Sequence, residues 1–367
     1  MIIPVLVAIT FLTGTGIVLS LLLIIAEKKI LNYGLCTIDI NSGQRALTLS
    51  GGNSLLASLA ENGIFIPSAC GGRGSCAYCK VRILAGGGVI GPVEEPYLTP
   101  QDRQNRIRLA CQVKVRNDLQ IEIPRELFTV KKFNAVVSRK RALTHDIFEL
   151  RLQLIDPPVI DFIAGQYVQL ESEEYKGRDA VMRAYSMSSV PSDREVIELI
   201  IRKVPEGIMT TWIFDYLKEG QKIRFSGPYG EFFLRDTQAP IIFIAGGSGM
   251  SPIYSIIRDM IAKNMRREAI YFFGALTQAD LFYLDELHRI EQQQAWFRFI
   301  PSLSREPEGT DWGGERGIIT QTLTKFKPDC RGHEAYLCGS PGLIEASNKT
   351  LIAAGIDPAC IYYDKFA

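Results

Sequence analysis

The sequence predicts a multidomain protein of mixed α+β and α/β class, with an apolar N-terminal helix followed by three folded domains. Three features predict this arrangement. Residues 2–26 contain no charged side chain, residues 132–235 read as short strands separated by turn residues, and after Pro240 strands alternate with helices. A chain of 367 residues is also too long for a single domain.

The N-terminal segment 1–27 predicts a retained single-span transmembrane anchor. About 20 apolar residues cross the hydrocarbon core as a helix, and Lys28 and Lys29 favour a cytoplasmic side for the residues after them. A cleaved signal peptide is the alternative, but a basic start and a clear small-residue cleavage site are missing. We therefore expect a single-pass protein of the inner (cytoplasmic) membrane, with its soluble domains in the reducing cytoplasm, where structural disulfides are rare.

The charge balance argues against a nucleic-acid partner. Lys and Arg number 41 and Asp and Glu number 40, without a basic stripe. The chain has three histidines, which leaves little material for a histidine-based catalytic or metal site.

Four of the eight cysteines have the spacing of metal ligands, C-x5-C-x2-C and a fourth about thirty residues later. These are Cys70, Cys76, Cys79 and Cys111. The pattern is close to the one by which four thiolates hold a [2Fe-2S] cluster, whereas a zinc ribbon, the alternative, more often has two C-x2-C pairs. Three glycines separate the first two cysteines, and without Cβ atoms they let the loop wrap closely around the sulfurs.

The residues around these cysteines predict a small sheet crossed by one helix. Segments in which apolar and polar residues alternate precede and follow an amphipathic stretch that begins near Asn53. This order resembles the β-grasp ferredoxin domain over residues 33–128, and "PRELFTVKKF" resembles a linker into a larger part.

Residues 132–235 predict an antiparallel barrel, because short strands recur there without long helices. Alternation places Arg183 and Tyr185 of "RAYSM" on one face of a strand, a cation for a phosphate beside a ring for a flavin plane. Ser186 faces the other way, so only its backbone or a local twist of the strand brings it near the edge of a flavin. The motif resembles the R-x-Y-S of the ferredoxin-NADP reductase superfamily, which implies that the barrel binds FAD.

A second segment supports a flavin site. Gly207 precedes an expected helix, whose free N–H groups suit a phosphate. An ordinary capped amphipathic helix is the alternative. In the superfamily that the chain resembles, this segment holds the FAD pyrophosphate, and the matching residues are Gly207, Met209 and Thr210.

Residues 239–367 predict a doubly wound parallel sheet with ligands beyond the carboxyl ends of its strands. "GGSGMSP" resembles the superfamily's nicotinamide-nucleotide loop, which implies a binding role for Gly246, Gly247, Gly249 and Pro252. "YLCGSPG" resembles its second signature and implies that Cys338 and Gly339 lie beside the hydride-transfer site. The alternative for Cys338 is a small buried residue at a strand end.

The choice of nucleotide is less direct. Ser304 and Arg305 resemble the pair that NADP-linked members use for the 2′-phosphate. A carboxylate instead favours the free ribose hydroxyl of NADH, and the segment after the second strand lacks a basic residue but supplies Asp280 and Asp285. We therefore expect NADH, with Asp285 as a binding residue.

The order of anchor, ferredoxin domain, FAD barrel and NAD domain resembles the F subunit of the sodium-translocating NADH:quinone oxidoreductases over nearly the whole chain. "RLACQV", "SGPYGEFF" and "FYLDEL" carry the resemblance together with the cysteine spacing. It implies catalytic roles for Ser186, Cys338 and Phe366, the last as the aromatic residue that covers the flavin ring. The segment 171–182 is shorter than in a typical member of this family, so docking to neighbouring subunits can differ there.

The sequence therefore predicts an electron path from NADH to FAD to the [2Fe-2S] cluster, since a flavin takes two electrons and releases them singly. The expected enzyme is the electron-input subunit of a ubiquinone-reducing, sodium-translocating complex, with NADH, the membrane and other subunits as partners. One alternative is an anchored NAD(P)H-dependent reductase that feeds a monooxygenase or another oxygenase. A non-enzymatic partner subunit is the other.

Overall fold

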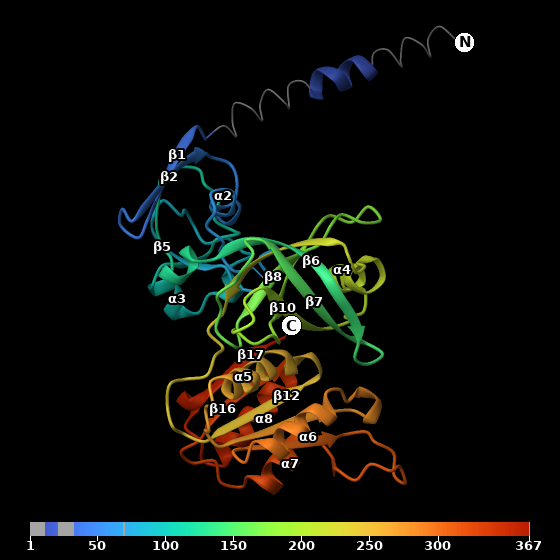
Figure 1. Ribbon diagram of the computed structural model, residues 1–367. Helices are drawn as coiled ribbons and strands as arrows, with labels where there is room; N and C mark the ends of the chain where they lie inside the picture. Colours follow the sequence, from blue (N-terminus) through green and yellow to red (C-terminus); the bar gives the residue numbers. More distant parts are fainter. Residues whose placement is uncertain (1–11, 21–32, 69, 367) are drawn as a thin grey trace, which may run out of the picture. The chain divides into compact units, whose positions relative to one another are not determined.

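The computed structural model describes residues 12–20, 33–68 and 70–366 (Figure 1). It divides into two compact units, Met1–Thr129 and Val130–Ala367. Residues 12–20 are helical, and the rest of the expected anchor at 1–27 lies outside the described residues. Among the residues that are described, no helix is long and apolar enough to cross a membrane.

The first unit contains a five-stranded mixed sheet in the order β2-β1-β5-β3-β4. Buried residues alternate with more exposed ones along β1, so the sheet covers a core on one face. The helix α2 packs there through Leu55 and Leu59, and its N-cap Ser54 accepts a hydrogen bond from the amide of Ala57 (3.2 Å). The elements are β1 (Leu35–Ile40), β2 (Arg45–Ser50), α2 (Leu55–Glu61), β3 (Lys80–Ala85), η1 (Glu95–Tyr97), α3 (Pro100–Gln104), β4 (Ile107–Leu109), β5 (Leu119–Glu122) and η2 (Arg125–Phe128).

The second unit begins with a six-stranded antiparallel sheet in the order β10-β7-β6-β11-β8-β9. A bridge between Met187 and Leu199 joins its two edges, so the sheet forms a nearly closed barrel, as the short alternating strands predict. The elements are β6 (Lys131–Ala142), β7 (Ile147–Asp156), β8 (Tyr167–Glu171), β9 (Met182–Ser186), β10 (Val196–Arg202), α4 (Ile208–Thr211), a π turn (Trp212–Tyr216) and β11 (Lys222–Tyr229).

A six-stranded parallel sheet completes this unit, in the order β15-β14-β13-β12-β16-β17, and confirms the predicted parallel domain. Helices α5 and α6 cover one face, and α7 and α8 cover the other. Because both faces are covered, β12 is apolar along its length. The elements are β12 (Ile241–Gly246), η4 (Gly247–Gly249), α5 (Met250–Ala262), β13 (Ala269–Ala275), η5 (Gln278–Asp280), α6 (Leu284–Gln293), β14 (Phe297–Leu303), β15 (Glu315–Arg316), α7 (Ile319–Phe326), β16 (Glu334–Gly339), α8 (Pro341–Ala353), η6 (Pro358–Cys360) and β17 (Ile361–Lys365).

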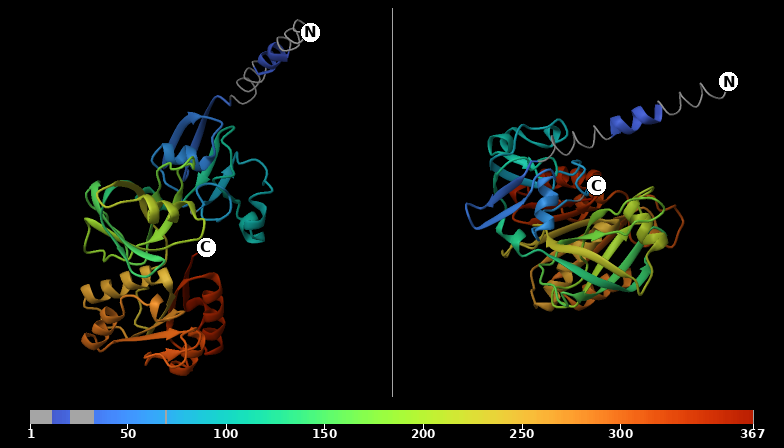
Figure 2. Two further views of the ribbon diagram at one scale, coloured as in Figure 1. Left: turned by 90° about the vertical axis from the view of Figure 1, so that its right-hand side faces the viewer. Right: turned by 90° about the horizontal axis from the view of Figure 1, so that it is seen from above.

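Helix α5 fastens the parallel sheet to the barrel. The hydroxyls of Ser251 and Ser255 donate to the carbonyl oxygens of Ser186 and Ser189, each at 2.6 Å. Both serines are buried, so these bonds are shielded from water. The C-terminus lies at this junction of barrel and parallel sheet (Figure 2).

Candidate active site and cofactor sites

Three strands bring a hydroxyl, a thiol and a carboxyl group together where the barrel meets the parallel sheet. Ser186 ends β9, and its hydroxyl donates to Asp364 Oδ2 of β17 (3.1 Å). Cys338 of β16 lies directly opposite Asp364 in the parallel register. The amide of Phe366 donates to the carbonyl oxygen of Gly339 (2.9 Å), which holds the end of the chain against the same strand.

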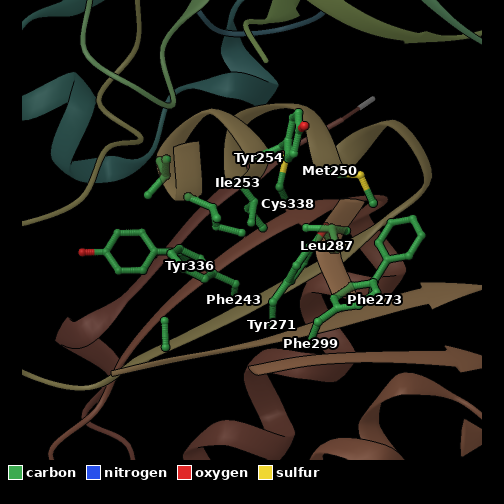
Figure 3. Packing of buried hydrophobic residues seen from close by; sticks show 14 of the residues in the cluster. Phe243, Met250, Ile253, Tyr254, Tyr271, Phe273, Leu287, Phe299, Tyr336 and Cys338 are labelled. Atoms are coloured by element: carbon green, nitrogen blue, oxygen red, sulfur yellow. The ribbon is translucent and has the colours of Figure 1, made fainter. Parts of the chain in front are cut away.

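Burial raises the pKa of two of these groups. Cys338 is fully buried within the aromatic cluster on one face of the parallel sheet (Figure 3), and burial together with the Asp364 carboxylate raises the pKa of its thiol. Burial also raises the pKa of Asp364, although the bond from Ser186 partly offsets this. The arrangement therefore provides a neutral thiol and a hydroxyl–carboxyl pair that can hold a proton.

The glycine loop after β12 approaches Cys338 closely. Gly247 has a φ of +56°, which favours glycine. A Cβ at Gly249 would lie 2.4 Å from the carbonyl oxygen of Cys338, so only glycine fits there without movement of the backbone. Gly246 ends β12 and Pro252 lies in the first turn of α5, as the motif predicts.

Strand β9 carries the residues that are expected to bind a flavin. Arg183 and Tyr185 are both half-buried, and burial raises the pKa of Tyr185. Arg183 Nη1 donates to the carbonyl oxygen of Met182 (2.7 Å), but no carboxylate among the described residues pairs with it. The half-buried guanidinium of Arg183 is therefore available to pair with a phosphate, and the ring of Tyr185 lies on the same strand. These two residues fit a bound FAD.

The segment after Gly207 is helical, as expected, but its α-helical part is short. The helix α4 has four residues and continues as a π turn. Gly207 is its N-cap and Met209 is buried. The hydroxyl of Thr210 is also buried and bonds to both the amide and the carbonyl oxygen of Val204 (3.2 Å each), so it fastens the preceding turn.

The four cysteines of the first unit form two pairs. The sulfurs of Cys70 and Cys76 lie 3.4 Å apart, and those of Cys79 and Cys111 lie 3.3 Å apart. Among the described residues, no group of three or more His, Cys, Asp or Glu side chains surrounds a single metal position. Two pairs suit a [2Fe-2S] cluster, in which four cysteines are shared between two irons, better than a zinc ion with four ligands of its own.

One thiol of each pair is easily ionised. Burial opposes ionisation of Cys70, but hydrogen bonds from Ser75 and Cys76 lower its pKa to about 6. The bond from Cys79 lowers the pKa of Cys111 to about 7, and the Gln112 side chain adds to this effect. Thiolates are the form that binds iron.

The structure does not bring every expected residue into the site. Asp285 is exposed in the first turn of α6, and no described residue makes a hydrogen bond or ion pair with its carboxylate. Asp364, which sequence reasoning missed, is part of the junction. Its available signal was an acidic residue in the last strand, two positions before Phe366.

Comparisons with known proteins agree with this division of sites. Three family models match the chain: a 2Fe-2S iron-sulfur cluster binding domain at residues 37–116, an oxidoreductase FAD-binding domain at 134–234 and an oxidoreductase NAD-binding domain at 243–349. The cofactors are thus FAD, a [2Fe-2S] cluster and NADH.

Full-length relatives decide the family. The F subunit of the Na(+)-translocating NADH-quinone reductase of Pseudomonas aeruginosa is 35% identical, over 96% of each chain. The corresponding F subunit of Neisseria meningitidis is 33% identical, over 98% of each chain. The chain belongs to this family of F subunits. Among solved structures, its fold is similar to the Amycolatopsis cytochrome P450 reductase GcoB, with 29% identity, a TM-score of 0.74, and coverage of 90% of this chain and 98% of that one.

Proposed function

We propose that this chain is the electron-input subunit of an NADH:quinone oxidoreductase and passes electrons from NADH to FAD and on to the [2Fe-2S] cluster. The observation that carries the proposal is the junction of Ser186, Cys338 and Asp364, where the FAD-binding barrel meets the nucleotide loop. When bound, FAD can accept a hydride and release its electrons singly, and the cluster can transfer one electron at a time.

The chain's own residues would orient the reactants, and the pair of Ser186 and Asp364 would hold a proton beside them. Arg183 and Tyr185 would hold the flavin phosphate and ring, and the loop at Gly246–Gly249 would hold the nucleotide. Asp364 accepts the hydrogen bond of Ser186 and so fixes the position of its hydroxyl. Because Cys338 is fully buried and neutral, it packs without adding a charge at the site. Phe366 is half-buried against the same core and would exclude water from the flavin face.

The membrane assignments belong to this proposal as well. In this proposal the chain has four segments, which are an anchor at 1–27, a cluster domain at 33–128, a FAD barrel at 132–235 and a nucleotide domain at 239–367. The anchor would be a single pass, with the other three segments on the cytoplasmic side and neighbouring subunits as electron acceptors. A single span offers no ion path, so sodium translocation and ubiquinone reduction would belong to the whole complex.

Anaerobic stopped-flow absorbance tests the electron path. The holoprotein is mixed with NADH, and we expect the flavin band to bleach first and the [2Fe-2S] band afterwards. Reduction of the cluster before the flavin, or no bleaching of either, would contradict the proposal.

A reductase that feeds an oxygenase is the second candidate, because GcoB, a cytochrome P450 reductase, has a similar structure over most of the chain. NADH-dependent reduction of ubiquinone in membranes that contain the chain with its copurifying proteins separates the two. Electron delivery to a copurified oxygenase instead of ubiquinone would favour this second function.

A further inference from the structure

The carboxyl ends of β13 and β14 form an edge beside the glycine loop of the nucleotide domain. The two strands are parallel partners, and β12, which carries that loop, is the other neighbour of β13. Beyond the strands, the amides of Ser304 and Arg305 donate to the carbonyl oxygens of Ala275 (3.0 Å) and Leu276 (2.8 Å), so the two connections remain side by side. Open parallel sheets bind nucleotides at this end of their strands.

Gln278 fixes a carboxylate at this edge. Glu306 Oε2 accepts a hydrogen bond from the amide of Gln278 (2.8 Å), and Oε1 accepts one from its side chain (2.9 Å). Arg316 holds the same loop through the carbonyl oxygens of Glu306 (3.0 Å) and Pro307 (2.9 Å). A carboxylate has about four acceptor positions, so the half-buried Glu306 keeps positions for another donor.

Arg305 is not fixed in this way. Its backbone is bonded to Leu276, but its side chain is exposed and makes no hydrogen bond or ion pair with any residue that the structure describes. Leu276, the first residue after β13, is 42% exposed and uncharged. A phosphate at this edge would therefore meet an oriented carboxylate, whereas the nearby guanidinium of Arg316 is already bonded to the carbonyl oxygens of Glu306 and Pro307 and to the hydroxyl of Thr310.

We propose that Glu306, positioned by Gln278, selects NADH against NADPH. Its carboxylate accepts a hydrogen bond from the free 2′-hydroxyl of the adenosine ribose and repels a 2′-phosphate. The inference rests on the proposed function, in which NADH is the reductant, and it assigns the selection to Glu306 rather than to Asp285 or Arg305.

Titration calorimetry of the oxidised holoprotein with NAD+ and with NADP+ tests this assignment. Loss of one charge-assisted hydrogen bond in Glu306→Gln should shift the ratio of the two dissociation constants toward NADP+ by about tenfold or more. Glu308→Gln is the matched control, because Glu308 is exposed in the same loop and bonds to no described residue. A shift below about twofold in Glu306→Gln, or an equal shift in Glu308→Gln, would overturn the proposal.

Two further measurements separate the possible failures. If neither NADH nor NADPH bleaches the flavin of the wild type in stopped flow, the proposed function fails. If NADH bleaches it but Glu306→Gln leaves the NADH-to-NADPH rate ratio unchanged, only the assignment to Glu306 fails. Gln278→Ala should shift the same ratio in the same direction, whereas an equal loss of affinity for both nucleotides would overturn its positioning role.

Discussion

Asp364 is a carboxyl group that folding makes harder to ionise, because burial raises its pKa. A group with a raised pKa in the folded state adds stability below its unfolded pKa, and this contribution is lost as the pH rises through the folded pKa. Asp364→Asn should therefore flatten the decrease in stability from the ordinary carboxyl range toward neutral pH. Urea denaturation across this range measures it, and identical pH profiles for both proteins would contradict the expectation.

In the proposed function, the Ser186 hydroxyl, which is bonded to Asp364, would donate a proton at the junction. Removal of a positioned proton donor typically slows a reaction by roughly 10²-fold or more. We expect Ser186→Ala to slow bleaching of the flavin by NADH by about that factor, while Ser138→Ala, an exposed barrel serine, keeps the wild-type rate. Equal rates for the two variants would show that the hydroxyl is not used.

Gly249 tests the close approach of the nucleotide loop to Cys338. A Cβ there would lie 2.4 Å from a backbone oxygen, so Gly249→Ala should cost about 1–3 kcal/mol of unfolding free energy. Gly342→Ala is the control, since a Cβ at this position in α8 meets nothing within 4 Å and alanine favours a helix. Thermal unfolding followed by circular dichroism compares them, and a neutral Gly249→Ala would show that the loop can move.

The residues that sequence reasoning identified lie in short local motifs. Ser186 and Cys338 each stand within a recognisable run, so their place at strand ends could be predicted. The positions of Asp364 and Glu306 could not be found in this way, because that of Asp364 depends on the pairing of β17 with β16 and that of Glu306 on a bond to Gln278, distant in sequence.

At the scale of elements, the connection from β3 to η1 is held by a buried ion pair. Arg108 donates to three carbonyl oxygens of residues 87–89 (2.8–3.0 Å) and to Glu94, whose other oxygen accepts the amide of Leu109. Arg108→Ala would leave Glu94 buried without its partner, at a cost of about 3–5 kcal/mol.

Hydrogen exchange of the Leu109 amide measures this cost locally. We expect much faster exchange in Arg108→Ala. The control is Arg103→Ala, which breaks an exposed pair with Glu95 worth at most about 1 kcal/mol. Unchanged protection of Leu109 in Arg108→Ala would show that the connection does not depend on the pair.

Strands were the easier elements to predict. The period-two pattern of the barrel and the apolar runs after Pro240 are local, so both sheets could be expected. The four-residue α4 and its π turn were not, because the apolar spacing of 207–217 suits an ordinary helix as well. The order of strands within each sheet depends on contacts between distant segments and cannot be read from a pattern.

For the whole molecule, the division at residue 130 predicts that electron input is separable from the cluster. The unit Val130–Ala367 contains both the FAD-binding and the NAD-binding matches and its own cores. Expressed alone, it should bind FAD and bleach with NADH without any [2Fe-2S] absorbance. A fragment that binds FAD but does not react with NADH would show that the first unit is needed for hydride transfer.

The bonds from α5 to the barrel tie two properties of the enzyme together. One end of this helix follows the glycine loop, and its buried serines donate hydrogen bonds to the backbone at the end of β9 and just beyond it. In the proposed function, the position of α5 therefore affects both the affinity for the reductant and the distance over which the hydride travels. A substitution that shifts α5 should therefore also shift the backbone at Ser186 and Ser189.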